Sequence, residues 1–337
     1  MRAMILRAPG GLERLELVDR TDPGMPVPGE VRVRIHATSL NYHDLLVAIG
    51  AAPTQDGRVP MADGAGVIEA VGDGVTSFEL GDSVVSGFFP SWLDGPATIG
   101  DFHNTPGDGI DGFAQQYVTL PATAFTHAPA GWSHAEAATI TTAGLTAWRA
   151  LVVEGGIKPG DSVLTLGTGG VSIYALQLAK AAGARVVITS SSDEKLDRAR
   201  ALGADHTINY LAHERWGAAI REWTGGRGVD HVVETGGPGT LAQSIEAVRI
   251  GGHIALIGVL TGRAGQVPIA MLMARQSRLQ GLLVGSRREQ QDFVRALDVS
   301  SSSRPVIDRC FAMPDLASAF AEQQAGRHFG KICATWE

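Results

Sequence analysis

Cysteine is scarce in this chain, whose 337 residues include only Cys310 and Cys333. The two thiols belong to no metal-binding or Cys-x-x-Cys spacing, so the sequence offers neither a zinc motif nor a dithiol redox motif. No apolar run reaches the roughly 18 residues that a membrane-spanning helix needs. The net charge of −7 also lacks the basic footprint of nucleic-acid binding. We therefore expect neither a membrane nor a nucleic acid as a partner.

The start of the chain lacks the pattern of a secretory signal, because polar residues and glycines follow residues 1–6 at once. We therefore expect a cytoplasmic protein. The hydrophobic content of 44% and the charged content of 19% are ordinary for a globular enzyme. The length is enough for two domains or for one large α/β unit.

Residues 1–125 are predicted to be rich in short β-strands and tight turns. The period-2 alternation of a half-buried strand is clearest at Val31, Val33, Ile35 and Ala37. The stretch 87–112 is rich in glycine, proline and aspartate and is predicted to be a long loop. It carries four large aromatic residues, Phe88, Phe89, Trp92 and Phe102. These side chains could cover the edge of a barrel or line a substrate pocket.

From residue 126 onward helical patterns appear. Ser133 and Glu136 have capping-box spacing at the start of a helical stretch that runs to about residue 153. Six predicted strands then alternate with helices, at 163–166, 185–189, 207–210, 229–234, 252–258 and 279–284. This alternation is typical of a doubly wound parallel sheet of the α/β class. The tail, with a serine turn at 300–303, has too few apolar residues for its own core and is expected to return to the first domain.

The first strand of the predicted sheet leads into a glycine-rich turn, Gly167-Thr168-Gly169-Gly170-Val171-Ser172. This is the looser form of G-x-G-x-x-G, with serine at the third glycine position. Glycine lets the backbone N–H groups of a helix N-terminus approach a pyrophosphate. The motif alone is weak evidence, but within a βα alternation it predicts a dinucleotide site.

The second predicted strand ends in serines, where NAD-binding folds carry an acidic residue about 20 positions after the glycines. Ser190 holds that position, and Ser191 and Lys195 follow it. A carboxylate there would repel a 2′-phosphate, whereas hydroxyls and a cation accept one. NADP(H) is therefore predicted over NAD(H). Alternatively, Ser191 and Glu194 form a capping box and Lys195 is an ordinary helix residue.

Segments along nearly the whole chain resemble the medium-chain dehydrogenase/reductase superfamily, in its zinc-independent quinone-oxidoreductase-like branch. They include Ser39-Leu40-Asn41-Tyr42-His43-Asp44 and the stretches 66–72, 143–148, 166–172, 201–205, 225–230 and 330–332. The resemblance implies a GroES-like β-rich catalytic domain at 1–125 and 287–337. It also implies a Rossmann NADP-binding domain at 126–286.

The resemblance further implies the site residues. Asn41 would donate a hydrogen bond near the nicotinamide and the substrate oxygen, and Asp44 would fix the local backbone. Tyr42 and His43 would orient the substrate or relay a proton, although a structural role of His43 stays open. Tyr210 could equally be a packing residue. The implied cofactor-binding residues are Thr146, Gly167, Thr168, Gly169, Gly170, Val171, Ser190, Ser191, Lys195, Tyr210, Gly236, Gly258, Val259, Leu260, Val284, Gly285, Ser286, Gly330 and Lys331.

Zinc-dependent relatives carry their ligands at the positions of Asn41, Ala62 and Thr142, none of which is a thiol or imidazole here. The loop 87–112, where a structural zinc would bind, contains no cysteine. A catalytic zinc needs about three protein ligands, so no metal is predicted.

Without a Lewis acid, the chain is expected to transfer hydride from NADPH to a quinone or an α,β-unsaturated carbonyl compound. The alternatives are a zinc-independent alcohol dehydrogenase or carbonyl reductase, and an NADPH-binding sensor without turnover. A homodimer is expected, because the apolar strand at 279–284 should form a sheet edge, and such edges commonly pair in this family.

Overall fold

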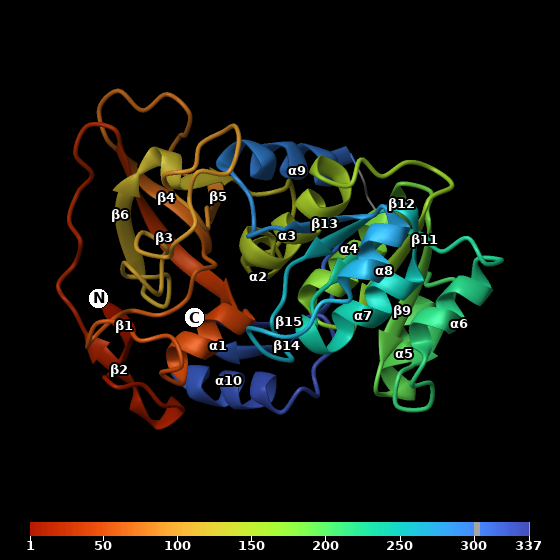
Figure 1. The fold of residues 1–337 in the computed structure, drawn as a ribbon. Helices are drawn as coiled ribbons and strands as arrows, with labels where there is room; N and C mark the ends of the chain where they lie inside the picture. Colours follow the sequence, from red (N-terminus) through yellow and green to blue (C-terminus); the bar gives the residue numbers. More distant parts are fainter. Residues whose placement is uncertain (300–303, 337) are drawn as a thin grey trace. The chain divides into compact units, whose positions relative to one another are not determined.

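The computed structural model describes residues 1–299 and 304–336, so the serine turn expected at 300–303 lies outside the described residues. The chain divides into two compact units (Figure 1). The first unit comprises Met1–Leu145 and Val284–Glu337, and the second comprises Thr146–Leu283.

The first unit is built around a seven-stranded sheet in the order β14-β15-β3-β4-β5-β7, with β6 also paired to β3. Its strands are β3 (Glu30–Ser39), β4 (Ala65–Val71), β5 (Ser83–Ser86), β6 (Tyr117–Pro121), β7 (Phe125–His127), β14 (Ile307–Ala312) and β15 (Lys331–Thr335). A separate antiparallel pair joins β1 (Arg2–Leu6) to β2 (Leu15–Asp19). The predicted alternation in β3 is confirmed, because Val31, Val33, Ile35 and Ala37 are all buried. The tail returns here as expected, with β15 antiparallel to β3.

The helices of this unit connect and cover the strands. They are the α-helices α1 (Tyr42–Ala48), α2 (His134–Ala138), α9 (Arg287–Val299) and α10 (Leu316–Gln324), the 3₁₀ turns η1 (Leu12–Arg14), η2 (Ala122–Ala124) and η5 (Met313–Asp315), and the π-helical segment η3 (Ile140–Gly144). The predicted capping box is confirmed at α2, where Ser133 accepts from Glu136 N and the Glu136 carboxylate accepts from Ser133 N.

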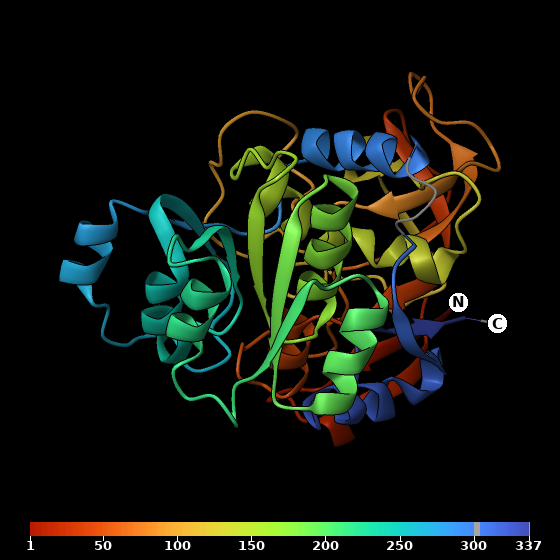
Figure 2. The same cartoon turned by 90° about the vertical axis from the view of Figure 1, so that its right-hand side faces the viewer.

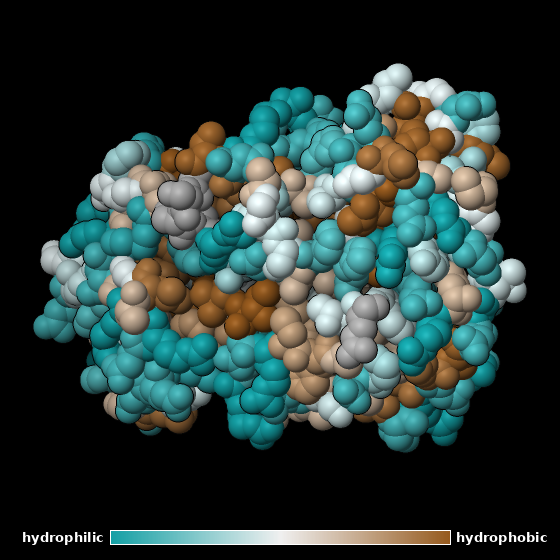
Figure 3. Space-filling view, turned by 180° about the vertical axis from the view of Figure 1, so that it is seen from behind, coloured by the Kyte–Doolittle hydropathy of each residue, from teal (hydrophilic) through white to brown (hydrophobic). Residues whose placement is uncertain are grey.

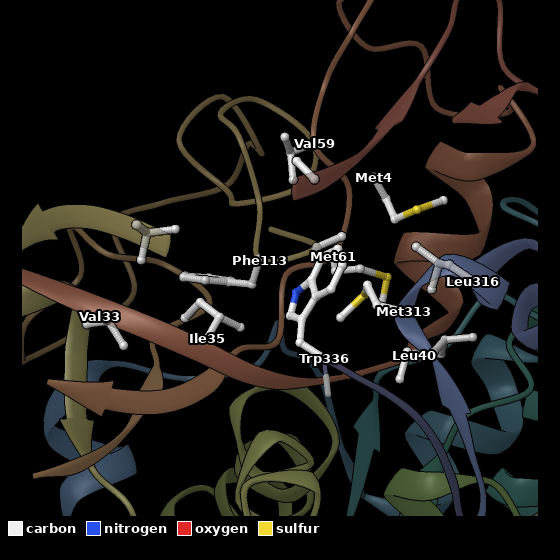
Figure 4. Packing of buried hydrophobic residues seen from close by; sticks show 14 of the residues in the cluster. Met4, Val33, Ile35, Leu40, Val59, Met61, Phe113, Met313, Leu316 and Trp336 are labelled. Carbon is white, nitrogen blue, oxygen red and sulfur yellow. The ribbon is translucent and has the colours of Figure 1, made fainter. Parts of the chain in front are cut away.

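The core of the first unit draws side chains from both ends of the chain (Figure 4). Met4 of β1 and Ile35 of β3 belong to the same buried cluster as Leu316 of α10 and Trp336, which follows β15. Burial of apolar side chains from such distant segments is the main stabilising contribution to a fold of this kind. The tail is therefore part of this core.

The second unit contains a six-stranded, all-parallel sheet in the order β10-β9-β8-β11-β12-β13. Its strands are β8 (Ser162–Leu166), β9 (Arg185–Ser190), β10 (His206–Asn209), β11 (Val229–Glu234), β12 (Val248–Leu256) and β13 (Arg278–Gly281). Counted from β8, this is the order 3-2-1-4-5-6 of a dinucleotide-binding doubly wound sheet. The predicted fold class is confirmed.

Helices cover both faces of this sheet. In Figure 2 the green helices α4 (Gly170–Ala181) and α5 (Asp193–Ala201) lie on one side. The teal and blue helices α6 (Trp216–Trp223), α7 (Pro238–Ala247) and α8 (Ile269–Arg275) lie on the other. The unit begins with the end of α3 (Leu145–Trp148) and the π-helical segment η4 (Arg149–Val153).

Three details differ from the sequence-based expectations. Residues 126–145 belong to the first unit, because α2 packs on β3, β4 and β5. The last strand ends at Gly281 and does not reach residue 284, where Val284 has a positive φ of 41° that no extended strand allows. Helix α8 was not predicted, since it has no side-chain cap and none of its residues is fully buried.

The surface combines polar cover with scattered apolar side chains. On the face in Figure 3 hydrophilic residues predominate and hydrophobic ones form separate smaller areas. Among the described residues, no helix is both long and apolar enough to cross a membrane. Exposed large apolar residues include Ile269 and Met273 of α8.

Candidate active site

The implied catalytic residues lie where β3 passes into α1 in the first unit (Figure 1). Asn41 is the N-cap of α1, and the Asp44 carboxylate accepts hydrogen bonds from Asn41 N at 2.9 Å and Asn41 Nδ2 at 3.0 Å. This is a local i, i+3 arrangement that satisfies the N–H group of a helix end. It fixes the backbone and the amide of Asn41 together.

Lys331 holds the other end of the Asn41 amide. Its ammonium donates to Asn41 Oδ1 and to Leu40 O, both at 2.6 Å. Asn41 Nδ2 also donates to Ser39 O at 3.3 Å. The donors and the acceptor of the Asn41 amide therefore all have partners within the first unit. Donation to a substrate oxygen, as the sequence implies, would require one of these bonds to open.

Lys331 is a buried cation, with 4% of its side chain exposed, and it lies 3.7 Å from the Asp63 carboxylate. The resemblance also implies that Lys331 binds the cofactor. In the structure its ammonium contacts Leu40, Asn41 and Asp63, so Lys331 also holds these segments of the first unit together. Gly330, the preceding residue, lets the chain approach Val306 closely, and Lys331 N donates to Val306 O.

Asp63 is a site residue that sequence reasoning missed. Its carboxylate is fully buried and accepts from the hydroxyls of Ser39 and Thr142, each at 2.5 Å. Burial raises the pKa of the Asp63 carboxyl, and the Lys331 ammonium and these hydroxyls oppose that rise. Burial, and then the Asp63 charge, raise the pKa of Asp44 to about 6. The Lys331 ammonium and the carboxyl groups of Asp44 and Asp63 are thus all buried from solvent.

This network lies at the positions to which the resemblance assigns zinc ligands. Asn41 is bonded as above, Thr142 donates to Asp63, and Ala62 offers only a methyl group and a backbone N–H that donates to Asp44. Within residues 1–299 and 304–336, no group of three His, Cys, Asp or Glu side chains could hold a metal ion. These residues do not fit a catalytic zinc, and a lysine ammonium supplies the positive charge among them.

His43 faces the long loop 87–112. Its Nε2 lies 3.2 Å from Asp108 Oδ2, a close approach that lacks hydrogen-bond geometry. Its ring packs against Phe102 and Phe88, with centroid distances of 4.5 and 5.8 Å. Two of the aromatic residues of the loop, Phe88 and Phe102, therefore lie beside His43. Tyr42, in contrast, is 40% exposed and accessible to a small molecule.

The predicted dinucleotide turn lies in the second unit between β8 and α4. Gly167 has a positive φ of 71°, which favours glycine, and Gly169 is the N-cap of α4. A Cβ at either glycine would meet open space. Ser172, at the third glycine position, is buried and donates to Leu166 O at 2.6 Å. The turn, with Thr168, Gly170 and Val171, thus has the shape for a pyrophosphate at a helix N-terminus.

The serines predicted to accept a 2′-phosphate lie where β9 ends. Ser190 closes the strand and is buried, and its hydroxyl accepts from Ser192 N. The capping interpretation of Ser191 and Glu194 is wrong by one residue. Ser192 is the N-cap of α5, because its extended backbone lets its hydroxyl accept from Lys195 N.

Tyr210 lies beside this strand end, since Tyr210 N donates to Ser190 O. Its side chain is 40% exposed. Thr146, in α3, is buried instead. The structure thus brings Ser190, Ser191, Lys195 and Tyr210 to one corner of the sheet.

A buried carboxylate that the sequence did not reveal organises the next predicted cofactor segment. Glu234, at the end of β11, accepts from Gly236 N, Gly237 N and the hydroxyls of Thr240 and Ser244. Gly258 approaches this turn so closely that a Cβ would lie 1.8 Å from Thr235 O. The residues that follow it, Val259 and Leu260, are exposed.

The remaining predicted cofactor residues, Val284, Gly285 and Ser286, belong to the first unit. They form the turn before α9, where Ser286 N donates to Glu289 Oε2 at 2.6 Å. Like the other cofactor assignments, theirs remain predictions.

Two family models match the chain. Residues 27–130 match the "Alcohol dehydrogenase GroES-like domain" and residues 170–302 match "Zinc-binding dehydrogenase". A zinc-type alcohol dehydrogenase-like protein of Schizosaccharomyces pombe is 43% identical over 331 residues, which cover 96% of this chain and 95% of that protein.

Solved structures are similar throughout. An NAD-dependent alcohol dehydrogenase has a TM-score of 0.90 and 36% identity, with all of both chains covered. A quinone oxidoreductase of Pseudomonas syringae pv. tomato DC3000 has a TM-score of 0.83 and 29% identity, with 99% of both chains covered. The resemblance is confirmed at the level of the superfamily, and it covers both units.

Proposed function

Because the chain belongs to the medium-chain dehydrogenase/reductase superfamily, we propose that it is an NADPH-dependent, metal-free reductase of quinones or α,β-unsaturated carbonyl compounds. Its class is that of an oxidoreductase related to alcohol dehydrogenases and quinone oxidoreductases. The observation that carries the finer proposal is the Lys331 network. It fills the positions of the zinc ligands with side chains that bond to one another.

The residues at the positions of the zinc ligands determine which reactions the site favours. Oxidation of a simple alcohol is helped by a Lewis acid that lowers the pKa of the hydroxyl, and the residues here do not fit one. A quinone or enone already carries an electrophilic carbon that accepts hydride directly. The protein then has to bind the substrate, orient it and deliver a proton to it.

The nicotinamide cofactor would supply the hydride when bound to the second unit. Members of the family bind such cofactors. We propose that the turn Gly167–Val171 holds the pyrophosphate and that Ser190, Ser191 and Lys195 hold a 2′-phosphate. The absence of a carboxylate at Ser190 supports NADPH. Because a similar structure is an NAD-dependent enzyme, the cofactor preference needs its own test.

The residues of the first unit would handle the substrate. We propose that Tyr42 and His43 orient its oxygen and deliver a proton there, with Asp108 Oδ2 3.2 Å from His43 Nε2. The aromatic rings of Phe88 and Phe102 beside His43 support a flat, conjugated substrate. Asn41, held by Lys331 and Asp44, keeps the shape of this strand end.

The test is NADPH oxidation with an ortho-quinone, an enone and a simple aldehyde, each supplied separately. Turnover of the quinone or the enone supports the proposal. Turnover of the aldehyde alone would identify a zinc-independent carbonyl reductase instead. Tight NADPH binding with no turnover of any of them would identify a sensor.

We also propose a homodimer. The edge position predicted for the last strand is confirmed, since β13 ends the sheet order of the second unit. An unpaired edge strand is a template for pairing with another chain. Ile269 and Met273 of α8, just before β13, are 74% and 75% exposed, which supports an apolar contact there. A cytoplasmic location remains a prediction.

A further inference from the structure

The two cysteines lie next to each other in the first unit, although helix α10 lies between them in the sequence. Cys310 lies in β14, the edge strand of the seven-stranded sheet, and Cys333 lies in the neighbouring β15. The strands are parallel, and the two cysteines are register partners. No other cysteine is present in the sequence.

Their geometry suits a disulfide. Neighbouring strands lie about 4.8 Å apart, and disulfides join Cα atoms separated by about 4.4–6.8 Å. Residues directly opposite each other in a sheet carry their side chains on the same face. Both thiols are free, and each shifts the pKa of the other.

The two thiols differ in their surroundings. Cys310 is exposed, and its contact with Cys333 lowers the pKa of the Cys310 thiol to about 7. Cys333 is fully buried and also approaches Ala135 O, at 3.5 Å, and its thiol pKa is raised, mainly by Cys310 and by burial. An exposed thiol with thiolate character is the nucleophile in oxidation, and a neighbouring thiol then acts as the resolving group.

We propose that Cys310 and Cys333 form a peroxide-sensitive dithiol site that closes reversibly to an intramolecular disulfide. The Cys310 thiolate attacks one oxygen of hydrogen peroxide, the O–O bond breaks, and Cys310 sulfenic acid and hydroxide form. The Cys333 sulfur then attacks the sulfenic sulfur, and water leaves as the S–S bond forms. In total, two thiols and one peroxide give one disulfide and two waters.

This site is distinct from the site proposed for hydride transfer and does not depend on that function. It lies on a strand that the active-site network also uses, since Lys331 is the first residue of β15. Cys310, on the edge strand, is exposed to a small oxidant and to thiol reductants, and exposed disulfides are the labile ones.

The experiment uses the full chain, reduced, desalted and treated with equimolar hydrogen peroxide at neutral pH. We expect the free-thiol count to fall from two to zero, and a non-reducing digest to contain the 310 and 333 peptides joined. Dithiothreitol should restore both thiols. The Cys333→Ser variant should retain a Cys310 sulfenic acid that dimedone traps, whereas Cys310→Ser should keep its thiol for far longer.

Three results would overturn the proposal. One is a chain that keeps both thiols under peroxide, and another is a digest with over-oxidised Cys310 but no joined peptide. The third is a disulfide between two chains through Cys310. These readouts come from the unaltered protein, so they decide the question even if a variant fails to fold.

Discussion

Lys331 is the residue on which the local structure of the candidate site most depends. It connects β15 to Asn41 at the end of β3 and to Asp63 in the chain before β4. In a dry environment, removing one partner of an ion pair leaves an uncompensated charge, which costs far more than the pair contributes net. The ammonium therefore stabilises the arrangement of Asn41 and Asp63 as long as both carboxylates nearby remain buried.

We predict that Lys331→Met lowers the free energy of unfolding by roughly 3–5 kcal/mol, because it leaves Asp63 buried without its cation. Urea denaturation measures this loss. The exposed Lys158 is the matched control, and Lys158→Met should change the value by less than about 0.5 kcal/mol. Adding Asp63→Asn to Lys331→Met should recover part of the loss. A loss below about 1 kcal/mol for Lys331→Met would contradict this role.

The cofactor preference also depends on single residues. We predict that Ser190→Asp reverses a preference for NADPH over NADH, because a carboxylate repels the 2′-phosphate. Lys195→Ala should weaken NADPH binding by ~1.5–3 kcal/mol, which is roughly ten- to hundredfold. Fluorescence titration with NADPH and NADH measures both, with Lys158→Ala as the control. Unchanged constants in both variants would remove these residues from the phosphate site.

At the scale of elements, the sequence predicts what local spacing determines. The alternation in β3 and the capping box at Ser133 depend on residues two or three positions apart, and both are present. Helix α8 follows Pro268 without a side-chain cap and has no fully buried residue, with only Leu272 partly buried against the core of the second unit, so its local signal is weak. The π-helical segments share the apolar pattern of an α-helix and cannot be distinguished from one by periodicity.

In the candidate site, too, the features set by local spacing were predictable and those set by the tertiary fold were not. The glycine turn and the serine at the end of β9 were recognisable because a motif spacing defines them. Asp63 was not, because its partners Ser39, Thr142 and Lys331 come from three distant parts of the chain. Only the tertiary fold joins them, and no spacing in the sequence reports it.

The edge formed by β13 and α8 gives a prediction about assembly. We expect the native chain of 35.3 kDa to elute at twice that mass in size-exclusion chromatography with light scattering. The double variant Ile269→Lys, Met273→Lys should be monomeric, because charge replaces apolar contact. Leu80, which is 75% exposed in the first unit, is the control, and Leu80→Lys should stay dimeric. A monomeric native chain, or a dimeric double variant, would refute this interface.

At the scale of the whole molecule, buried titratable groups set the dependence of stability on pH. Burial, with Arg278 and His231 nearby, lowers the pKa of His253 to about 4. Burial also lowers the pKa values of His36, His134, His206 and His231. Asp44 has a raised pKa of about 6, so its protonated form stabilises the fold at low pH. That stabilisation is lost as the pH rises through about 6, whereas the histidines stabilise the fold less at low pH.

Whether the histidines make stability rise or fall with pH depends on how many protons the folded and unfolded chains bind. Between pH 6.5 and about 4 the unfolded chain binds a proton at residue 253 that the folded chain does not, so stability falls as the pH falls. The full effect at His253 is on the order of 3 kcal/mol. We predict that His253→Asn flattens the pH dependence of the unfolding free energy across this window. The exposed His213 is the control, and an unchanged slope in His253→Asn would contradict the assignment.

We propose that this dehydrogenase-like chain transfers hydride from NADPH without a metal. The most direct measurement is the rate of NADPH oxidation with the best quinone or enone acceptor, before and after exhaustive chelation, with elemental analysis of the same samples. We predict that turnover stays unchanged after chelation and that zinc lies well below one ion per chain. Stoichiometric zinc whose removal abolishes turnover, and whose return restores it, would contradict the claim.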